Sequence, residues 1–377
     1  MKLVDMEGAQ PKITCHVKTY RQAKGWSQAQ LADAVGVKRQ AIYDIESGRY
    51  LPNTGVAIRL SKILDCTVET LFSEENTGDV VEVSLAGDAS TDSPRLYTAK
   101  VRGRLVGVPL TGQVLFNRGL PASDAILEKQ GSQARLYCPN EILDKTILLF
   151  GCDPAFSILG DHVGRALPGA RVHCCFASSY ASLQALSKGY AHVGGIHLHN
   201  RLGGESNVTL AREMLPGMEG KVFGFTTMEE GLMVAKNNPH AIHAIEDLYR
   251  KNLRFVNREC GAALRILFDD QLERVNIPKE AINGYATEVK SHNDGARLVA
   301  AGGADAALGL HGVADLFGID FVPLTVVRCD LVIPDDLMDH PTIRIMLDML
   351  QTRALRDDIA SVPGYETSSS GSLIDTL

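Results

Sequence analysis

Residues 257–261, with the sequence NRECG, form a polar run between two apolar stretches. The preceding LRFV is typical of a strand, and the following ALRILFDDQL is typical of a helix. A strand, a glycine turn and a helix N-terminus present free backbone N–H groups and the positive end of the helix dipole, which suit an anion or a small polar ligand. The alternative is an ordinary turn, in which Asn257 is a cap and Arg258 and Arg265 are structural.

Other polar residues also follow stretches that are typical of strands. In an α/β sheet ligands bind outside the carboxyl ends of the strands, so we expect these residues to converge on one cleft. The predicted ligand-binding residues are Cys152, Asp153, Ser178, Ser179, Asn200, Asn257, Glu259, Gly261, Arg265 and Tyr285.

The charges among these residues bear on the ligand. Arg258 and Arg265 bring positive charge to the predicted cleft, whereas Asp153 and Glu259 bring negative charge that a bare dianion would not tolerate. The sequence therefore favours a ligand with both donors and acceptors, or a cofactor-like molecule, and a molybdenum-cofactor-related sensor is one alternative. A simple oxyanion remains the alternative if the acids turn outward and pair with the arginines.

Motifs for catalysis, cofactors and metals are missing from the sequence. It contains no G-x-S-x-G, H-E-x-x-H, P-loop or G-x-G-x-x-G after a strand, so we expect no enzyme and no cofactor. His197 and His199 alternate on one stretch, but two imidazoles without a third partner favour a core histidine and a cleft-facing one over a metal site. Cys152 and Cys260 have no base close in sequence, which favours inert packing.

The elements that must position these residues lie in residues 146–377. Apolar strand-like runs alternate there with helical stretches, beginning with KTILLFG and FSILGDHVGRAL and continuing to ADAALGL and IDFVPLT. This alternation predicts an α/β body with a mostly parallel sheet.

Residues 13–75 have a different pattern and predict an all-α head. We expect helices from about Thr14 to Lys24, over QAQLADAV and KRQAIYDIES, and in the segments TGVAIRLSKIL and TVETLF. Ser27 is a helix cap and Gly36 permits a tight turn, so the second and third helices form a helix-turn-helix.

The third helix is expected to enter a DNA groove, because Ile42 and Ile45 face the core and leave a polar face outside. Gln28 is placed to contact a phosphate or to brace Gln40. The predicted DNA-binding residues are Ser27, Gln28, Lys38, Arg39, Gln40 and Tyr43. A helical interaction module with a solvated basic face is the alternative.

Residues 76–145 form the third region. Strand-like alternation broken by Gly and Pro follows an acidic, turn-rich segment, which predicts a linker and a small β-subdomain. A basic cluster of Arg95, Lys100, Arg102 and Arg104 is more typical of a solvated strand face than of a contact to the DNA backbone.

The whole chain is typical of a soluble multidomain protein. Its 377 residues are 45% hydrophobic and 22% charged. No apolar run reaches the roughly 18 residues of a membrane helix and no signal peptide is apparent, so we expect a cytoplasmic protein that does not enter membranes. The net charge of −7 is uneven, at +3 up to Ser73 and −10 beyond, which assigns any nucleic-acid contact to the head.

The head resembles the lambda-repressor-like (XRE) helix-turn-helix family over its full length, through SQAQLA, GVKRQAIYDIESGRYLP and VETLF. The resemblance implies binding to double-stranded operator DNA. It also implies a structural pair between Arg21 and Glu46.

The body resembles the type-2 periplasmic-binding-protein-like domain found in cytoplasmic regulators and fused in some proteins to a molybdopterin biosynthesis enzyme. The matching segments include GCDPA, FVNRECGAALR, GGADAALGL and IDFVPL. This implies two lobes around a sensor cleft. Where the family pattern has Ser-Gly-Thr, this chain has Ala262, Ala263 and Leu264, and the missing hydroxyls argue against molybdate or tungstate.

Together the two resemblances imply a one-component, ligand-responsive transcription regulator that binds DNA as a homodimer or higher homo-oligomer. Two alternatives remain open. One is an enzyme on a binding-protein-like scaffold with a DNA-binding appendage, and the other is a constitutive repressor with an empty pocket.

Overall fold

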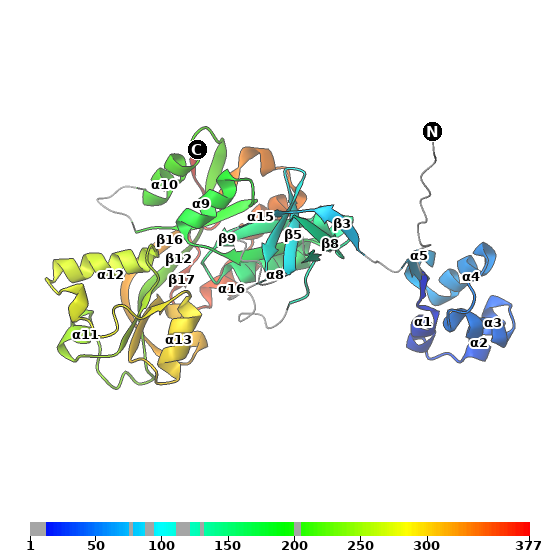
Figure 1. Cartoon of the computed structure of the whole chain (residues 1–377), viewed down its shortest axis with the longest axis horizontal. Helices are drawn as coiled ribbons and strands as arrows, with labels where there is room; N and C mark the ends of the chain where they lie inside the picture. Colours follow the sequence, from blue (N-terminus) through cyan, green and yellow to red (C-terminus); the bar gives the residue numbers. More distant parts are fainter. Residues whose placement is uncertain (1–12, 75–77, 87–93, 111–120, 129–131, 200–204) are drawn as a thin grey trace. The chain divides into compact units, whose positions relative to one another are not determined.

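The computed structural model describes residues 13–74, 78–86, 94–110, 121–128, 132–199 and 205–377. The chain divides into two compact units, residues 1–79 and 80–377 (Figure 1). We call the first unit the head and describe each unit by itself.

The head is built from short helices around a small apolar core. The helices are α1 (Val17–Ala23), α2 (Gln28–Val35), α3 (Arg39–Glu46), α4 (Thr54–Leu64) and α5 (Val68–Leu71). Leu31, Val35, Ile42, Ile45 and Leu60 are buried in the core. The predicted inward face of the third helix is therefore confirmed.

One predicted helix in the head begins too early. Thr14 and Cys15 belong to a strand, β1 (Ile13–Cys15), which pairs antiparallel with β2 (Phe72–Glu74). The β-branched Ile13 and Thr14 favour a strand, and their partner lies almost sixty residues further along the chain. Local sequence does not reveal such a pairing.

Two caps define the helix-turn-helix. Ser27 accepts a hydrogen bond from the backbone N–H of Gln30, whose side chain bonds back to the N–H of Ser27. Gly36 ends α2 with a φ of +76°, in the left-handed region that favours glycine. The chain can thus turn at once into α3.

In the second unit, two long antiparallel strands connect two lobes. β12 (Gly220–Val234) and β16 (Asp320–Pro334) each have 15 residues and pair along most of their length. Among the described residues they lie inside a ten-stranded sheet in the order β10-β9-β11-β16-β12-β15-β13-β14, with β17 (Tyr365–Glu366) and β18 (Leu373–Thr376) against β12.

The prediction of a mostly parallel sheet is correct within each lobe and wrong at the centre. Strands β9, β10 and β11 run parallel in lobe one, and β13, β14 and β15 run parallel in lobe two. The central strands are antiparallel to their neighbours β11 and β15. Both connecting strands therefore pass from one lobe to the other, a crossing that the local pattern does not reveal.

Lobe one carries the first half of the predicted cleft. Its strands are β9 (Thr146–Gly151), β10 (Arg171–Phe176) and β11 (Val193–His197). Its helices are α7 (Asn140–Leu143), α8 (Phe156–Ala166), α9 (Ser179–Ser187), α10 (Ser206–Met214), α15 (Pro341–Leu350) and α16 (Arg353–Ala360).

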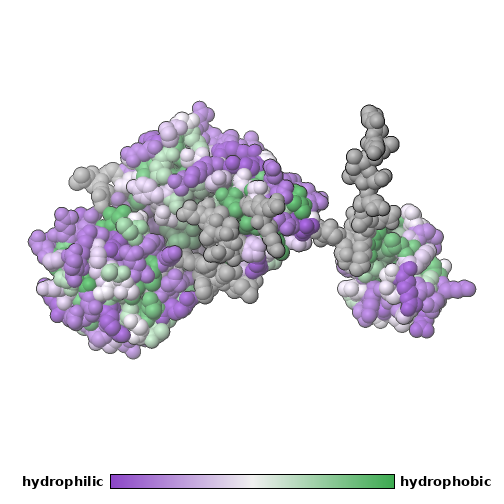
Figure 2. Space-filling view, in the orientation of Figure 1, coloured by the Kyte–Doolittle hydropathy of each residue, from purple (hydrophilic) through white to green (hydrophobic). Residues whose placement is uncertain are grey.

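Lobe two carries the second half of the predicted cleft. Its strands are β13 (Phe255–Arg258), β14 (Glu288–Val289) and β15 (Ala306–Leu310). Its helices are α11 (Glu246–Arg250), α12 (Ala263–Arg274), α13 (His292–Ala300) and α14 (His311–Leu316), and two 3-10 turns of the unit span Lys279–Ala281 and Asp335–Leu337. Hydrophilic residues make up much of its visible surface in Figure 2.

In the part of the chain that the structure describes, a six-stranded sheet packs on lobe one. Its strands are β3 (Asp79–Glu82), β4 (Ser84–Leu85), β5 (Arg95–Val101), β6 (Arg104–Pro109), β7 (Ala125–Leu127) and β8 (Gln133–Leu136). Ala99, Val101 and Val106 share one apolar core with Leu148 and Phe150 of β9. The sheet is thus an integral layer of the second unit.

The basic cluster on this sheet makes contacts within the second unit. Arg102 forms an ion pair of 2.6 Å with Asp336, Lys100 one of 2.8 Å with Asp144, and Arg104 donates to two backbone carbonyls after α9. Arg95 donates to the carbonyl of Pro121. These bonds favour a structural role over contact with a DNA backbone. Within the described ranges, no helix has the length and apolarity needed to cross a membrane.

Candidate functional site

A cavity lies where loops and helix starts of the two lobes meet. The centre of a water molecule can occupy about 20 Å³ of this cavity. That space holds one or two water molecules. From lobe one it is lined by Cys152, Phe176, Ser178, Ser179, Tyr180, His197 and Leu198, and from lobe two by Arg258, Glu259, Gly261, Ala262, Ala263, Leu264 and His292. We call this cavity the cleft.

Half of the predicted ligand-binding residues line the cleft. They are Cys152, Ser178, Ser179, Glu259 and Gly261. Asp153, Asn257, Arg265 and Tyr285 do not line it, so the structure does not bring these four to the cavity wall. Asn200 lies outside the described residues.

Asp153 is turned into the protein interior. It is 3% exposed, and its carboxylate accepts hydrogen bonds from the Thr226 hydroxyl at 2.6 Å, the Tyr365 hydroxyl at 2.9 Å and the Ala155 N–H at 2.9 Å. Burial raises the pKa of Asp153, against the opposing effect of these hydrogen bonds. The residue links β12 and β17 to the loop after β9 and brings no charge to the cleft.

Three other predicted residues support the lobe-two wall from behind. Asn257 is buried and donates to the backbone carbonyl of Tyr285. The Arg265 guanidinium stacks on the Tyr285 ring, 4.1 Å from its centroid, and donates to the carbonyl of Arg258. For Asn257 and Arg265 the structural alternative given by the sequence is therefore the better description.

Arg258 is the charged group of the lobe-two wall. Its side chain is 4% exposed and forms a two-pronged ion pair with Glu259, at 2.9 and 3.1 Å. It also contacts the His292 ring at 3.0 Å. Burial first, and the Arg258 charge second, lower the pKa of His292 well below its usual value. Glu259 thus pairs with an arginine. Because of this pairing, a simple oxyanion remains the alternative ligand.

The N-termini of two helices from opposite lobes border the cleft. Ser178 caps α9 by accepting from the Ala181 N–H, and Ser179 bonds the backbone of His197 at 2.9 and 3.0 Å. Helix α12 begins after Ala262, which has no side chain that caps the helix. The first N–H groups of α12, at Ala263 and Leu264, therefore remain suited to an anionic group of a ligand.

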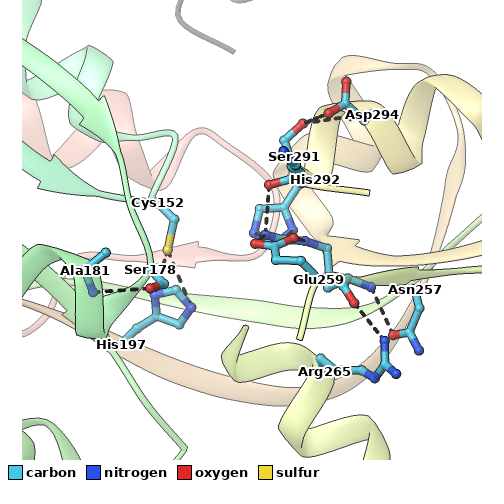
Figure 3. Close-up of polar contacts among 12 residues, drawn as sticks. Cys152, Ser178, Ala181, His197, Asn257, Glu259, Arg265, Ser291, His292 and Asp294 are labelled. Atoms are coloured by element: carbon cyan, nitrogen blue, oxygen red, sulfur yellow. Dashed lines mark hydrogen bonds and ion pairs between the residues drawn. The ribbon is translucent and has the colours of Figure 1, made fainter. Parts of the chain in front are cut away.

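A thiol, two imidazoles and a carboxylate form a second group at the cleft. The Cys152 sulfur lies 3.4 Å from Nδ1 of His197, and Nε2 of His197 lies 3.4 Å from the Glu230 carboxylate (Figure 3 draws the first contact). Nε2 of His199 lies 2.9 Å from the other Glu230 oxygen. The prediction that no base lies near Cys152 is wrong, because the sequence separates the two residues by 45 positions.

Charges within this group stabilise each other. Burial alone would lower the pKa of His197, but Cys152 and Glu230 together raise it well above the usual value. Burial alone would raise the pKa of Glu230, but His197 and His199 hold it far below the usual range. His197 is the core histidine that the sequence favoured, although it also lines the cleft. Among the described residues, no three His, Cys, Asp or Glu side chains are arranged to hold a metal ion.

The head contains the predicted DNA-binding surface. Lys38, Arg39, Gln40 and Tyr43 are exposed at the start of α3, where a groove-bound helix contacts base edges. Gln40 donates to Asp44 at 3.2 Å. Ser27 serves as the cap of α2.

Gln28 has a partner that the sequence did not suggest. Its amide donates to Glu46 at 2.9 Å, so it does not brace Gln40. Glu46 also receives two hydrogen bonds from Arg21, at 2.6 and 3.0 Å, which confirms the pair implied by the family resemblance.

Comparison with known proteins agrees with this division. The profile of the helix-turn-helix family matches residues 17–71, and that of the PBP superfamily domain matches residues 160–351. The chain is 27% identical over 228 residues to YvgK of Bacillus subtilis, covering 60% of this chain and 73% of YvgK. It is 39% identical over 62 residues to the HTH-type transcriptional regulator YgzD of B. subtilis, covering 16% of this chain and 94% of YgzD.

Solved structures similar to the body include a substrate-binding protein with bound phosphate from Clostridium perfringens, at 13% identity and a TM-score of 0.46, covering 57% of this chain and 97% of that chain. Another is the effector-binding domain of QuiR in complex with shikimate, at 12% identity and a TM-score of 0.40, covering 54% of this chain and 93% of that chain.

The fold and the cleft thus define a two-lobed binding domain joined to a helix-turn-helix head. The chain belongs to the PBP superfamily and carries an N-terminal helix-turn-helix domain of the XRE type.

Proposed function

We propose that the chain is a one-component transcription regulator whose head binds operator DNA and whose cleft binds a small effector. The observation that carries this proposal is that the walls of the cleft come from two lobes, which β12 and β16 join. Closure of such lobes on a ligand changes their relative geometry. A ligand that binds one geometry better shifts the population toward it.

The effector is a small polar molecule with one anionic group, such as a carboxylate or a phosphate. The N–H groups at the start of α12 and the guanidinium of Arg258 favour an anion. Glu259 already neutralises much of the Arg258 charge, so a donor on the ligand also finds an acceptor there. This arrangement supports a ligand with mixed donors and acceptors, which binds without turnover.

A simple oxyanion is the second candidate, and a specific observation favours it. Asp153 does not line the cleft, and Glu259, which does, is paired with Arg258, so neither acid brings an unpaired negative charge to the cleft. Calorimetry of the full chain with molybdate, tungstate, sulfate and phosphate separates the candidates. Micromolar binding of any of these anions favours the oxyanion.

The head reads DNA through α3, and we propose that it does so as part of a homodimer in the cytoplasm. A single small head buries too little surface to bind tightly, and dimeric heads contact half-sites about one helical turn apart. The operator is therefore palindromic or pseudo-palindromic. Selection of bound fragments from a random DNA pool, followed by sequencing, tests this directly, since recovery of no common site would contradict a specific regulator.

A melting-temperature screen of the full chain against metabolites tests the cleft. A compound that binds only the folded state raises the melting temperature by mass action. The same screen with Ala263→Trp is the control, because a large side chain at this cleft-lining position occupies the cavity. Loss of the shift in this variant assigns binding to the cleft, and an unchanged shift places it elsewhere.

A further inference from the structure

We propose that Cys152 is a redox-modifiable thiol of the cleft, which a hydroperoxide oxidises to a sulfenic acid with His197 as its proton partner. This inference goes beyond the regulator proposed above. It depends only on the group around Cys152 and not on the identity of the effector or the operator.

The first support is the contact of a thiol with an imidazole that also lies near a carboxylate. Cys152 directly follows β9, lines the cleft and places its sulfur 3.4 Å from Nδ1 and 3.9 Å from Nε2 of His197, against the side of the ring. The far ring nitrogen of His197 lies 3.4 Å from Glu230, which is fully buried. A base held by a carboxylate beside a thiol is the arrangement that activates cysteine nucleophiles.

The second support is the rigidity of this arrangement. The backbone of His197 is held on both sides by Ser179, whose hydroxyl donates to the His197 carbonyl at 2.9 Å and accepts from its N–H at 3.0 Å. Glu230 lies at a shift in the register between β12 and β16, where the strands pass between the lobes. The backbone of His197 is therefore fixed beside Cys152.

The third support is the charge around the sulfur. The titratable groups around Cys152 and His197 are Asp153, His199, Glu230, Arg258, His292, Cys329 and Tyr365. Asp153, Cys329 and Tyr365 have pKa values raised by burial, which favours their neutral forms. Burial would lower the pKa of His197, but Cys152 and Glu230 raise it well above its usual value, which favours the imidazolium beside the sulfur.

Cys152 lines the cleft, so a small hydroperoxide that enters the cleft reaches its sulfur. In the step, the Cys152 thiolate attacks one peroxide oxygen, an S–O bond forms and the O–O bond breaks. Sulfur loses two electrons and the peroxide gains them. The leaving hydroxide takes the proton of the His197 imidazolium and departs as water.

The other cysteines provide internal references. Cys260 is exposed in the loop before α12, and its thiol makes no hydrogen bond within the part of the chain that the structure describes. Cys175 and Cys329 are buried, and burial raises the pKa of each thiol. Exposure alone would therefore make Cys260 the more reactive site, whereas activation by His197 makes Cys152 the more reactive one.

The test is oxidation of the full chain by hydrogen peroxide at pH 6, in the presence of a 1,3-dione that traps sulfenic acids. Peptide mass spectrometry measures the adduct at each cysteine. An ordinary thiol has well under about 1% thiolate at this pH, so we expect at least tenfold more adduct at Cys152 than at Cys260. Equal labelling of the two residues, or faster labelling of Cys260, overturns the proposal.

Variants then identify the proton partner. His197→Gln should reduce labelling of Cys152 to the level of Cys260, whereas His243→Gln, which removes an exposed imidazole in lobe two, should leave it unchanged. Undiminished labelling in a folded His197→Gln protein contradicts the role of His197. If that variant does not fold, the wild-type rate from pH 5 to 9 decides, because an unactivated Cys152 follows the same pH profile as Cys260.

Discussion

The ion pair between Arg21 and Glu46 connects α1 to α3 in the head. Their side chains are 9% and 3% exposed, and Glu46 accepts from both Arg21 and Gln28. Removing one partner of a buried pair leaves the other charge unsatisfied, so Arg21→Ala should lower the free energy of unfolding of the head by about 3–5 kcal/mol.

The fluorescence of Trp26, the only tryptophan in the chain, measures this loss in urea titrations of the full protein. Arg49→Ala is the matched control, because its partner Asp44 lies 3.8 Å away and the Arg49 side chain is 67% exposed. We expect that change to cost less than about 1 kcal/mol. Similar losses in both variants would show that the Arg21 pair is no stronger than a surface contact.

The same pair predicts how the head responds to acid. Burial would raise the pKa of Glu46, but hydrogen bonds from Arg21 and Gln28 outweigh it and lower the pKa in the folded state. A lowered pKa contributes stability above the unfolded value of about 4.3, and that stability is lost as the pH falls through the folded pKa. Unfolding followed by Trp26 should therefore become easier below about pH 4. Glu46→Gln should flatten this dependence, and an unchanged profile would contradict the assignment.

Specific DNA binding is predicted to depend on the start of α3. Arg39→Ala or Gln40→Ala should cost about 1–3 kcal/mol on the selected operator and should relax its sequence preference. Lys62→Ala, which removes an exposed positive charge from α4, is the control. Fluorescence anisotropy on operator and random DNA measures both. Equal losses on the two DNAs would show that α3 does not read bases.

For single residues, the sequence predicted which side chains lie near the cleft better than it predicted where they point. It placed Cys152, Ser178 and Glu259 at the cleft because each follows a strand. It failed for Asp153, since the hydroxyls that turn this residue inward come from Thr226 and Tyr365, 73 and 212 positions away. The contact between His197 and Cys152 was missed for the same reason.

The turn between β13 and α12 determines the lobe-two wall. Gly261 has a φ of +87°, and a Cβ at this position would meet no atom within 4 Å, so the cost of Gly261→Ala comes from the backbone alone. That cost is about 1–2 kcal/mol. Gly302→Ala is the matched control for Gly261→Ala, since Gly302 follows α13 with a φ of +73° and equally open surroundings.

Both glycine variants should lose similar stability in denaturant titrations of the full chain. Only Gly261→Ala should also weaken binding of a compound found in the melting-temperature screen, because only that turn lines the cleft. Equal binding by the two variants would show that the conformation of the turn is irrelevant to the ligand.

The local pattern predicted most elements of the body but not their pairing. Alternating strands and helices were expected at β9, α8, β10, α9 and β11, and the structure has them. In the stretch PHAIHAIEDLYR, which has a helix-like pattern, only Glu246–Arg250 is helical, since Asn238 holds Ile242 in a loop through two hydrogen bonds. The antiparallel run of β12 and β16 depends on pairing across about a hundred residues, which no local pattern reveals.

For the whole molecule, a ligand-responsive regulator requires free-energy coupling between the cleft and the head. An effector that changes the affinity for DNA must itself be bound with an affinity that DNA changes by the same factor. Typical coupling is about 1–3 kcal/mol, or about 5–150-fold. The proposed oxidation of Cys152 does not depend on this coupling, since oxidation of the thiol is measured in the absence of DNA.

The most direct test is the affinity of the full chain for its selected operator, measured by fluorescence anisotropy with and without the compound that raises its melting temperature. We expect saturating compound to change the dissociation constant at least about fivefold. We also expect Ala263→Trp to abolish this response and Lys62→Ala to retain it. An operator affinity that is the same with an empty and a filled cleft would contradict a ligand-responsive regulator.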